Sequence, residues 1–94
     1  MIEIEFDPAK DAINRNKHGI GLAAAAVILS GRHVRQRSGL QNDSGEERWV
    51  AVGRIEGRFL VCVYTMRLSV YRVISLRAAR TKERRAYEEA FQSE

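Results

Sequence analysis

Residues 49–76, WVAVGRIEGRFLVCVYTMRLSVYRVISL, decide the fold of this chain. Apolar, β-branched and aromatic side chains dominate three runs within it, which is typical of strands. Glu56-Gly57 supplies a two-residue turn, and Arg67-Leu68-Ser69 supplies the next connection. Connections this short force neighbouring strands to run antiparallel. The stretch therefore predicts a meander of three strands, over residues 49–55, 59–66 and 70–76.

Weaker strand patterns lie upstream of the meander. Residues 32–38 form a polar run suited to an edge strand, and residues 39–45 are rich in turn formers. Residues 2–6 alternate apolar and acidic side chains, which is the period of a half-buried strand. The predicted sheet is thus an antiparallel meander of three to four strands, with a further strand at the N-terminus.

Three helices complete the predicted order. Asp7 caps the first, Pro8 occupies its first position, and Gly19 ends it after His18. The second, over residues 22–29, is alanine-rich and apolar nearly all round. Thr81 caps the last, which reaches about residue 92. Ninety-four residues suit a single domain, so we expect one α+β domain over residues 1–94, with its helices packed on one face of the meander.

The positive charge is concentrated in the later part of the chain. The net charge is +4, made up of −1 over residues 1–31, +2 over residues 32–60 and +3 over residues 61–94. Thirteen of the sixteen basic residues are arginine, whose planar fork matches phosphate and carboxylate oxygens. Either this bias reflects anion binding, or a GC-rich genome has selected arginine codons.

Several classes of protein are not expected. The first residues lack the basic-then-apolar order of a signal peptide, and no apolar stretch approaches the roughly 20 residues of a membrane span. These features predict a cytoplasmic protein. The single cysteine, Cys62, lies in an apolar run with no activating neighbour, which favours a buried structural thiol over a catalytic one. His18 and His33 have no metal-ligand spacing, and no glycine-rich phosphate loop is present, so we expect neither metal nor cofactor.

Arginines at the strand ends suggest a nucleic-acid surface on the sheet. Strand alternation predicts that Tyr71, Ser75 and Arg77 share one open face, while Arg72 and residues 74 and 76 point to the covered face. Arginines grip phosphates and aromatic rings stack on bases, so such a face suits single-stranded RNA. The candidate RNA-binding residues are Arg48, Arg54, Tyr71 and Ser75. The alternative is a solvated face with surface ion pairs.

A carboxylate pair, Glu46-Glu47, comes just before the Trp49 strand. One of these groups could remove a proton from a ribose 2′-hydroxyl that attacks the adjacent phosphate, and an arginine across the site would stabilise the developing charge. Chemistry of this kind needs no metal. His18 is open to two interpretations, a catalytic group or a capping residue at a helix end.

Six segments in register resemble the BrnT family of toxins. They are FDPAK from Phe6, N-x-x-KHGI from Asn14, EER from Glu46, VYTMR from Val63, RVISLR from Arg72 and ERRAYEE from Glu83. The resemblance covers nearly the whole chain. It implies a RelE-like fold and a ribonuclease toxin of a type II toxin–antitoxin system, which cleaves RNA without a metal and arrests growth.

The resemblance also implies site residues and partners. Glu47 would be the base, Arg67 and Arg77 would bind the scissile phosphate, and His18 and Arg48 are further candidates. The expected partner is a BrnA-like antitoxin with a ribbon-helix-helix segment, through which operator DNA is contacted only indirectly.

The chain departs from the family pattern at two points. Gly21-Leu22-Ala23-Ala24 replaces the usual polar cap and acidic start of the second helix, and residues 41–45 lack the histidine that tends to precede EER. The second departure removes a possible acid or base. The competing hypothesis is therefore a catalytically inactive BrnT-like protein that serves its antitoxin as a corepressor partner. A free-standing DNA-binding domain is disfavoured, because no helix carries a basic recognition face.

Overall fold

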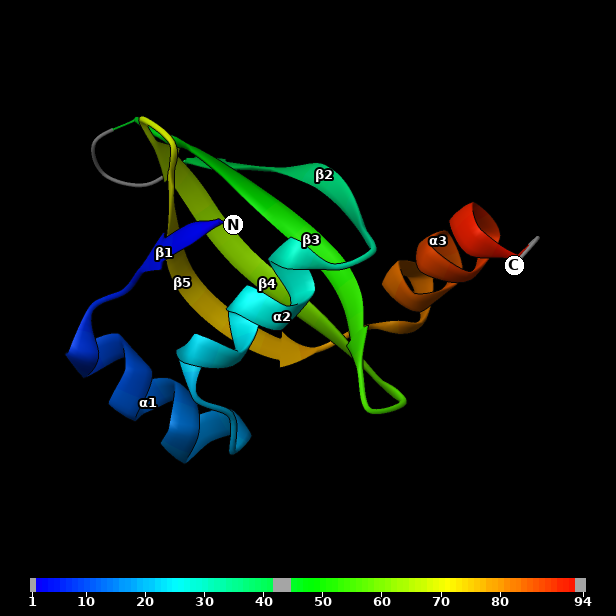
Figure 1. The fold of residues 1–94 in the computed structure, drawn as a ribbon, viewed down its shortest axis with the longest axis horizontal. Coiled ribbons are helices and arrows are strands. Elements are labelled where there is room, and N and C mark those ends of the chain that lie inside the picture. The colour runs from blue at the N-terminus through cyan, green and yellow to red at the C-terminus, as the bar shows by residue number, and fades with distance from the viewer. Residues whose placement is uncertain (1, 42–44, 93–94) are drawn as a thin grey trace.

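The computed structural model describes residues 2–41 and 45–92, and it contains one five-stranded sheet in the order β1-β5-β4-β3-β2 (Figure 1). The strands are β1 (Glu3–Glu5), β2 (His33–Gln41), β3 (Glu47–Ile55), β4 (Arg58–Arg67) and β5 (Val70–Ala78). The helices are α1 (Pro8–His18), α2 (Ala25–Ser30) and α3 (Thr81–Phe91), with a 3₁₀ turn, η1 (Leu22–Ala24), before α2. The predicted α+β class and order of elements are confirmed.

Strands β2 to β5 form the predicted antiparallel meander, now with four members. The β3–β4 turn consists of Glu56 and Gly57, both with positive φ, as the tight hairpin turn requires. Strand β1 pairs in parallel with β5, in the register Glu3 with Val70. The sequence predicted the strand but not this partner.

The first helix forms as its sequence predicts. The Asp7 side chain accepts a hydrogen bond of 2.8 Å from the backbone N–H of Ala9, and Gly19 adopts the left-handed conformation that ends the helix. Buried Asn14 then ties α1 to the sheet, because its side chain donates to the carbonyl of Leu76 at 2.9 Å and accepts from the Leu76 N–H at 3.2 Å. The predicted second helix begins as the 3₁₀ turn η1 and continues as α2.

Helices α1 and α2 lie on one face of the sheet, which we call the covered face (Figure 1). Its centre is apolar and fully buried, with Leu22 and Ile28 packed against the strands. Gly53 lets α2 approach closely, because a Cβ there would lie 2.7 Å from a methyl group of Ile28. The sheet residues of this core include Ala51, Leu60, Cys62, Tyr64, Val73 and Leu76.

Helix α3 packs on the opposite face, so the expectation that all helices share one face is wrong. Val52 and Val61 alternate with core residues along β3 and β4, yet both are fully buried. The ring of Phe59, on the same side as Val61, contacts the ring of Tyr87 on α3 at 5.5 Å. The helix covers only one end of this second face, which we call the open face. No helix in the described ranges is long and apolar enough to cross a membrane.

Candidate functional site

A cleft of about 410 Å³ lies where the uncovered part of the open face meets the first turn of α3. The four strands β2 to β5 supply its floor, and the start of α3 supplies its wall. The lining residues are Gln36, Arg37, Ser38, Arg48, Val50, Val63, Ile74, Ser75, Arg77, Arg80 and Glu83. A second hollow, of about 530 Å³, continues along α3 and shares Gln36, Arg80 and Glu83 with the cleft.

Arg77 and Glu83 form the central interaction of the cleft. The two guanidinium nitrogens of Arg77 donate to the two carboxylate oxygens of Glu83, each at 2.8 Å, and both side chains are largely buried. Glu83 also accepts from the backbone N–H of Arg80 at 2.8 Å, which fixes the start of α3. The hydrogen bonds from Arg77 lower the pKa of the Glu83 carboxyl, and the hydrogen bond to Glu83 raises the pKa of Arg77.

Arg48 and Ser75 lie beside this pair. Arg48 follows Glu47 on β3, and its Nε is buried without a hydrogen-bond acceptor among the described residues. Ser75 is paired with Val63 in the sheet, two residues before Arg77. The cleft is thus apolar at its floor and carries four arginines with one strongly held carboxylate nearby, an arrangement that suits an anion.

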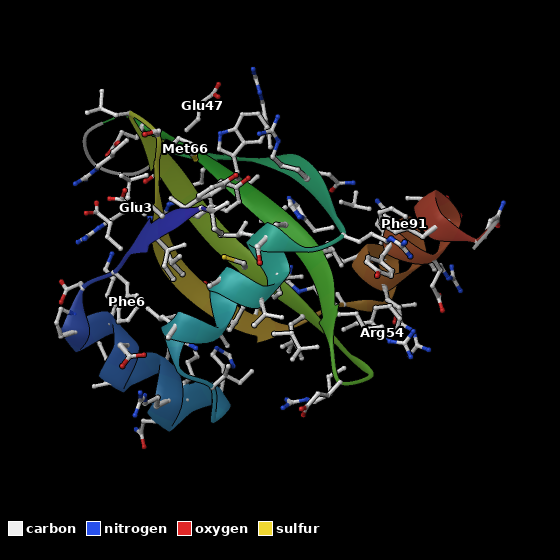
Figure 2. All side chains as sticks on the ribbon, viewed as in Figure 1. Glu3, Phe6, Glu47, Arg54, Met66 and Phe91 are labelled. Atoms are coloured by element: carbon white, nitrogen blue, oxygen red, sulfur yellow. The ribbon has the colours of Figure 1, made fainter. Side chains whose placement is uncertain are left out.

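Three of the eight predicted site residues therefore meet in the cleft: Arg48, Ser75 and Arg77. The predicted base does not join them. Glu47 is the first residue of β3, half-exposed, and its carboxylate lies 3.2 Å from Arg37. Figure 2 shows Glu47 and Arg54 near opposite ends of the sheet.

Arg67 is also separate from Arg77. It ends β4, where its guanidinium donates two hydrogen bonds to Glu46, at 3.0 and 3.2 Å. Arg67 is paired with Val70, and Arg77 lies seven residues further along β5, about 23 Å at 3.3 Å per residue. With each guanidinium held in its own ion pair, the two arginines do not converge on one phosphate, which corrects their predicted shared role.

Tyr71 lies on the covered face, so its predicted neighbourhood with Ser75 and Arg77 is wrong. A bulge explains the error, because the register shifts between Val63 and Tyr64, which pair with Ser75 and Val73. The extra residue, Ile74, reverses the alternation, so Tyr71 contacts the core ring of Tyr64 at 5.2 Å. The same reversal places Arg72 on the open face, whereas the sequence predicted the covered face.

His18 and Arg54 are the remaining candidates, and both lie outside the cleft. His18 is exposed at the last position of α1, a helix of the covered face. Arg54 lies over the ring of Phe59 at 5.2 Å, at the end of the sheet that α3 covers. The described ranges contain no group of three or more His, Cys, Asp or Glu side chains placed to hold a metal.

Sequence reasoning missed Glu83, although a signal for it was present. Glu83 is the third residue of α3, the position from which a glutamate reaches back to the N-terminal N–H of its helix. Such a glutamate is fixed in place, and Arg77 lies only six residues earlier. A glutamate at this position indicates the start of a helix and does not by itself indicate a functional site.

Fold and cleft together define a small α+β protein with an arginine-lined cleft on the open face of its sheet. A family model described as "Ribonuclease toxin, BrnT, of type II toxin-antitoxin system" matches residues 6–83. The chain therefore belongs to the BrnT family of ribonuclease toxins. The crystal structure of the Brucella abortus ribonuclease toxin BrnT matches with a TM-score of 0.62 and 25% identity, over 86% of this chain and 100% of that one. No curated protein matches significantly.

Proposed function

We propose that this toxin cleaves RNA in the cleft by metal-independent attack of a ribose 2′-hydroxyl, with Arg77 and Arg48 binding the scissile phosphate. One observation carries the proposal. Arg77 holds the carboxylate of Glu83 with two parallel hydrogen bonds of 2.8 Å, which is also how a guanidinium holds a phosphate. The unpaired Nε of Arg48 is a further donor for a phosphate oxygen.

The chemistry requires a base, a charge-stabilising group and a leaving group. The 2′-oxygen forms a bond to phosphorus and gives its proton to the base, while the bond from phosphorus to the 5′-oxygen breaks and that oxygen takes a proton from water. The products are a 2′,3′-cyclic phosphate and a 5′-hydroxyl. The arginines stabilise charge on the phosphate oxygens as it develops.

Glu83 is the carboxylate within reach of this phosphate, and we assign it the role of base in place of Glu47. Its paired state makes it a weak base, because the hydrogen bonds from Arg77 lower its pKa. A phosphate that takes over Arg77 removes those hydrogen bonds, and the pKa of Glu83 then rises towards its ordinary value. Substrate binding would thus activate the base.

The remaining parts of the proposal concern the cell. Cleavage of cytoplasmic RNA would inhibit translation and growth. A ribbon-helix-helix antitoxin would neutralise the toxin and would connect it to operator DNA. The arginine-rich residues 32–94 offer a field that attracts an acidic antitoxin segment as well as RNA.

One observation favours a second candidate function, an inactive partner that acts as a corepressor with its antitoxin. Glu47 and Glu83 are each paired with an arginine, and Glu46 is paired with Arg67. The hydrogen bonds from Arg77 lower the pKa of Glu83, so that carboxylate does not accept a proton readily while it stays paired. Loss of RNA cleavage with retained antitoxin binding would identify this function.

The test is cleavage of an oligoribonucleotide by purified protein, with the cyclic-phosphate product measured by mass spectrometry. We expect Glu83→Gln to lower the rate about 100-fold and Glu47→Gln to lower it less than about threefold. The reverse ranking would return the base to Glu47. Activity should survive EDTA, and complete inhibition by EDTA would contradict the metal-free scheme.

A further inference from the structure

A strip of cationic and aromatic side chains lies at the outer edge of the sheet, on the covered-face side of β2 and β3. Arg35 and Arg37 on β2 both lie over the ring of Trp49 on β3, at 4.6 and 5.3 Å from its centroid. We call these three residues the edge strip. Strand β2 is the last strand of the sheet, so the strip is bordered on its outer side by no other strand of the described residues.

The register of the sheet creates the strip. Arg37 is paired with Trp49 and Arg35 with Ala51, so both arginines project to the same side as the indole ring. Contacts of this kind contribute about 0.5–1 kcal/mol at exposed sites and hold a guanidinium plane in place. Both arginines are exposed, so the ring orders them without covering them.

The strip carries an excess of positive charge. Arg37 meets the carboxylate of Glu47 at 3.2 Å, with side-chain exposures of 69% and 47%. Such an exposed pair contributes about 0–1 kcal/mol and exchanges readily with another anion. No carboxylate of the described residues pairs with Arg35. The strip therefore offers one exposed guanidinium, Arg35, which lies near the phenol group of Tyr64, and one that is loosely held by Glu47.

The strip and the cleft lie on opposite faces of the sheet and meet at the edge strand β2, through Arg37. Gln36, Arg37 and Ser38 line the cleft, and Arg37 also belongs to the strip. Residues two apart on a strand lie about 6.6 Å from each other, a separation on the scale of successive phosphates in an extended nucleic-acid strand. A polyanion that leaves the cleft and passes around the edge of β2 would meet Arg37 first and Arg35 next.

We propose that the edge strip is a second RNA-binding site, which holds the nucleotides that flank the one in the cleft. The proposal rests on the proposed ribonuclease function. Phosphates would bind the exposed guanidinium edges, and a base would stack on a guanidinium plane already held flat by Trp49. RNA fits the strip better than a protein segment, because the strip combines stacked planes with a regular cationic spacing.

The test compares a short and a long ligand that cannot be cleaved. Affinities for 2′-O-methyl RNA of three and ten nucleotides are measured by fluorescence anisotropy at several salt concentrations. We expect Arg35→Gln to weaken the decamer about three- to tenfold and to lower the slope of log Kd against log salt by about 0.7, the loss of one phosphate contact. The trimer, confined to the cleft, should bind unchanged. Trp49, the single tryptophan of the chain, should change its emission with the decamer only.

Arg58→Gln is the matched control, because it removes the same charge from an exposed position at the opposite end of β3–β4. Equal effects of Arg35→Gln and Arg58→Gln would overturn the edge-strip proposal. Binding of the trimer would in that case leave the cleft proposal intact. Unchanged RNA affinity with weaker binding of the cognate antitoxin would assign the strip to a protein partner instead. Failure of the wild type to bind either RNA would overturn both proposals.

Discussion

The two faces of this sheet are built from the same strands but have different roles. On the covered face, Ala51, Cys62 and Leu76 are fully buried beneath α1, η1 and α2. On the open face, Val52 and Val61 are equally buried beneath α3, but the neighbouring positions carry arginine and serine around a cleft. The difference shows that the helices packed on a face of the sheet determine whether its side chains form core or remain accessible. Side chains beneath the helices are buried and stabilise the fold. Side chains beyond the end of α3 remain accessible to a ligand.

The largest effect we expect is on catalysis and comes from the open face. Arg77→Gln removes two donors from the proposed phosphate site, so cleavage should fall by about 100- to 1,000-fold. The thermal transition should stay cooperative, since the side chain lies outside the covered core. Steady-state cleavage of an oligoribonucleotide measures the effect.

Arg67→Gln is the control, because Arg67 holds an equivalent carboxylate pair outside the cleft. It should change cleavage by less than about threefold. A loss as large as that of Arg77→Gln would restore Arg67 to the active site and contradict the separation of the two arginines.

The largest effect on stability should come from the covered face. In Gly53→Ala the new Cβ would lie 2.7 Å from the Ile28 side chain, so α2 must shift, at a cost of about 1–3 kcal/mol. Urea unfolding measures the loss. The double variant with Ile28→Ala should be less destabilised than the sum of the two single changes, because the clash is shared. Strict additivity would mean that Gly53 does not set the approach of α2.

Cys62 provides a smaller test of the same face. Burial raises the pKa of its thiol to about 12, so a polar alkylating reagent should label the native protein far more slowly than the unfolded one. Cys62→Ala should cost about 1 kcal/mol and leave cleavage unchanged. Rapid labelling of the native thiol would show that the covered face opens.

The smallest expected effect is the pH dependence of the junction between the sheet and α3. The pKa of Glu83 is lowered in the folded state, so its contribution is present above its ordinary value of 4.5 and is lost as the pH falls through the lower, folded value. Wild-type stability should therefore drop more than that of Glu83→Gln between about pH 5 and about pH 3. Parallel urea titrations across that range check the difference, and identical slopes would contradict it.

The fold was predictable because its signals are local. Strand runs, the Asp7 cap, the terminating Gly19 and the Glu56-Gly57 turn each follow from a few neighbouring residues, and all were confirmed. The parallel pairing of β1 with β5 was not predictable, because it depends on contacts about 67 residues apart. The face on which α3 packs was missed because it also depends on contacts between residues that are distant in the sequence.

The candidate site was only partly predictable. Ser75 and Arg77 were predicted to share a face and both line the cleft, together with the candidate Arg48, whereas the bulge at Ile74 places Tyr71 on the other face. A single extra residue reverses every later side chain along a strand, and no local pattern announces it. Sequence also does not state which carboxylate an arginine will select. Glu83, the carboxylate that pairs with Arg77, was therefore not considered for the site.

The pairing of β1 with β5 also affects how the protein is made. Glu3 to Glu5 leave the ribosome well before their partners, Val70 to Arg72, which are synthesised 67 residues later, and Asn14 precedes its partner Leu76 by 62 residues. Until then the apolar, sheet-facing side of α2 has no complete sheet to pack against. Arg77 and Glu83 have also not yet left the ribosome. The cleft therefore cannot assemble until the chain has been synthesised past Glu83 and these residues have left the ribosome, long after β1 and α1 have emerged.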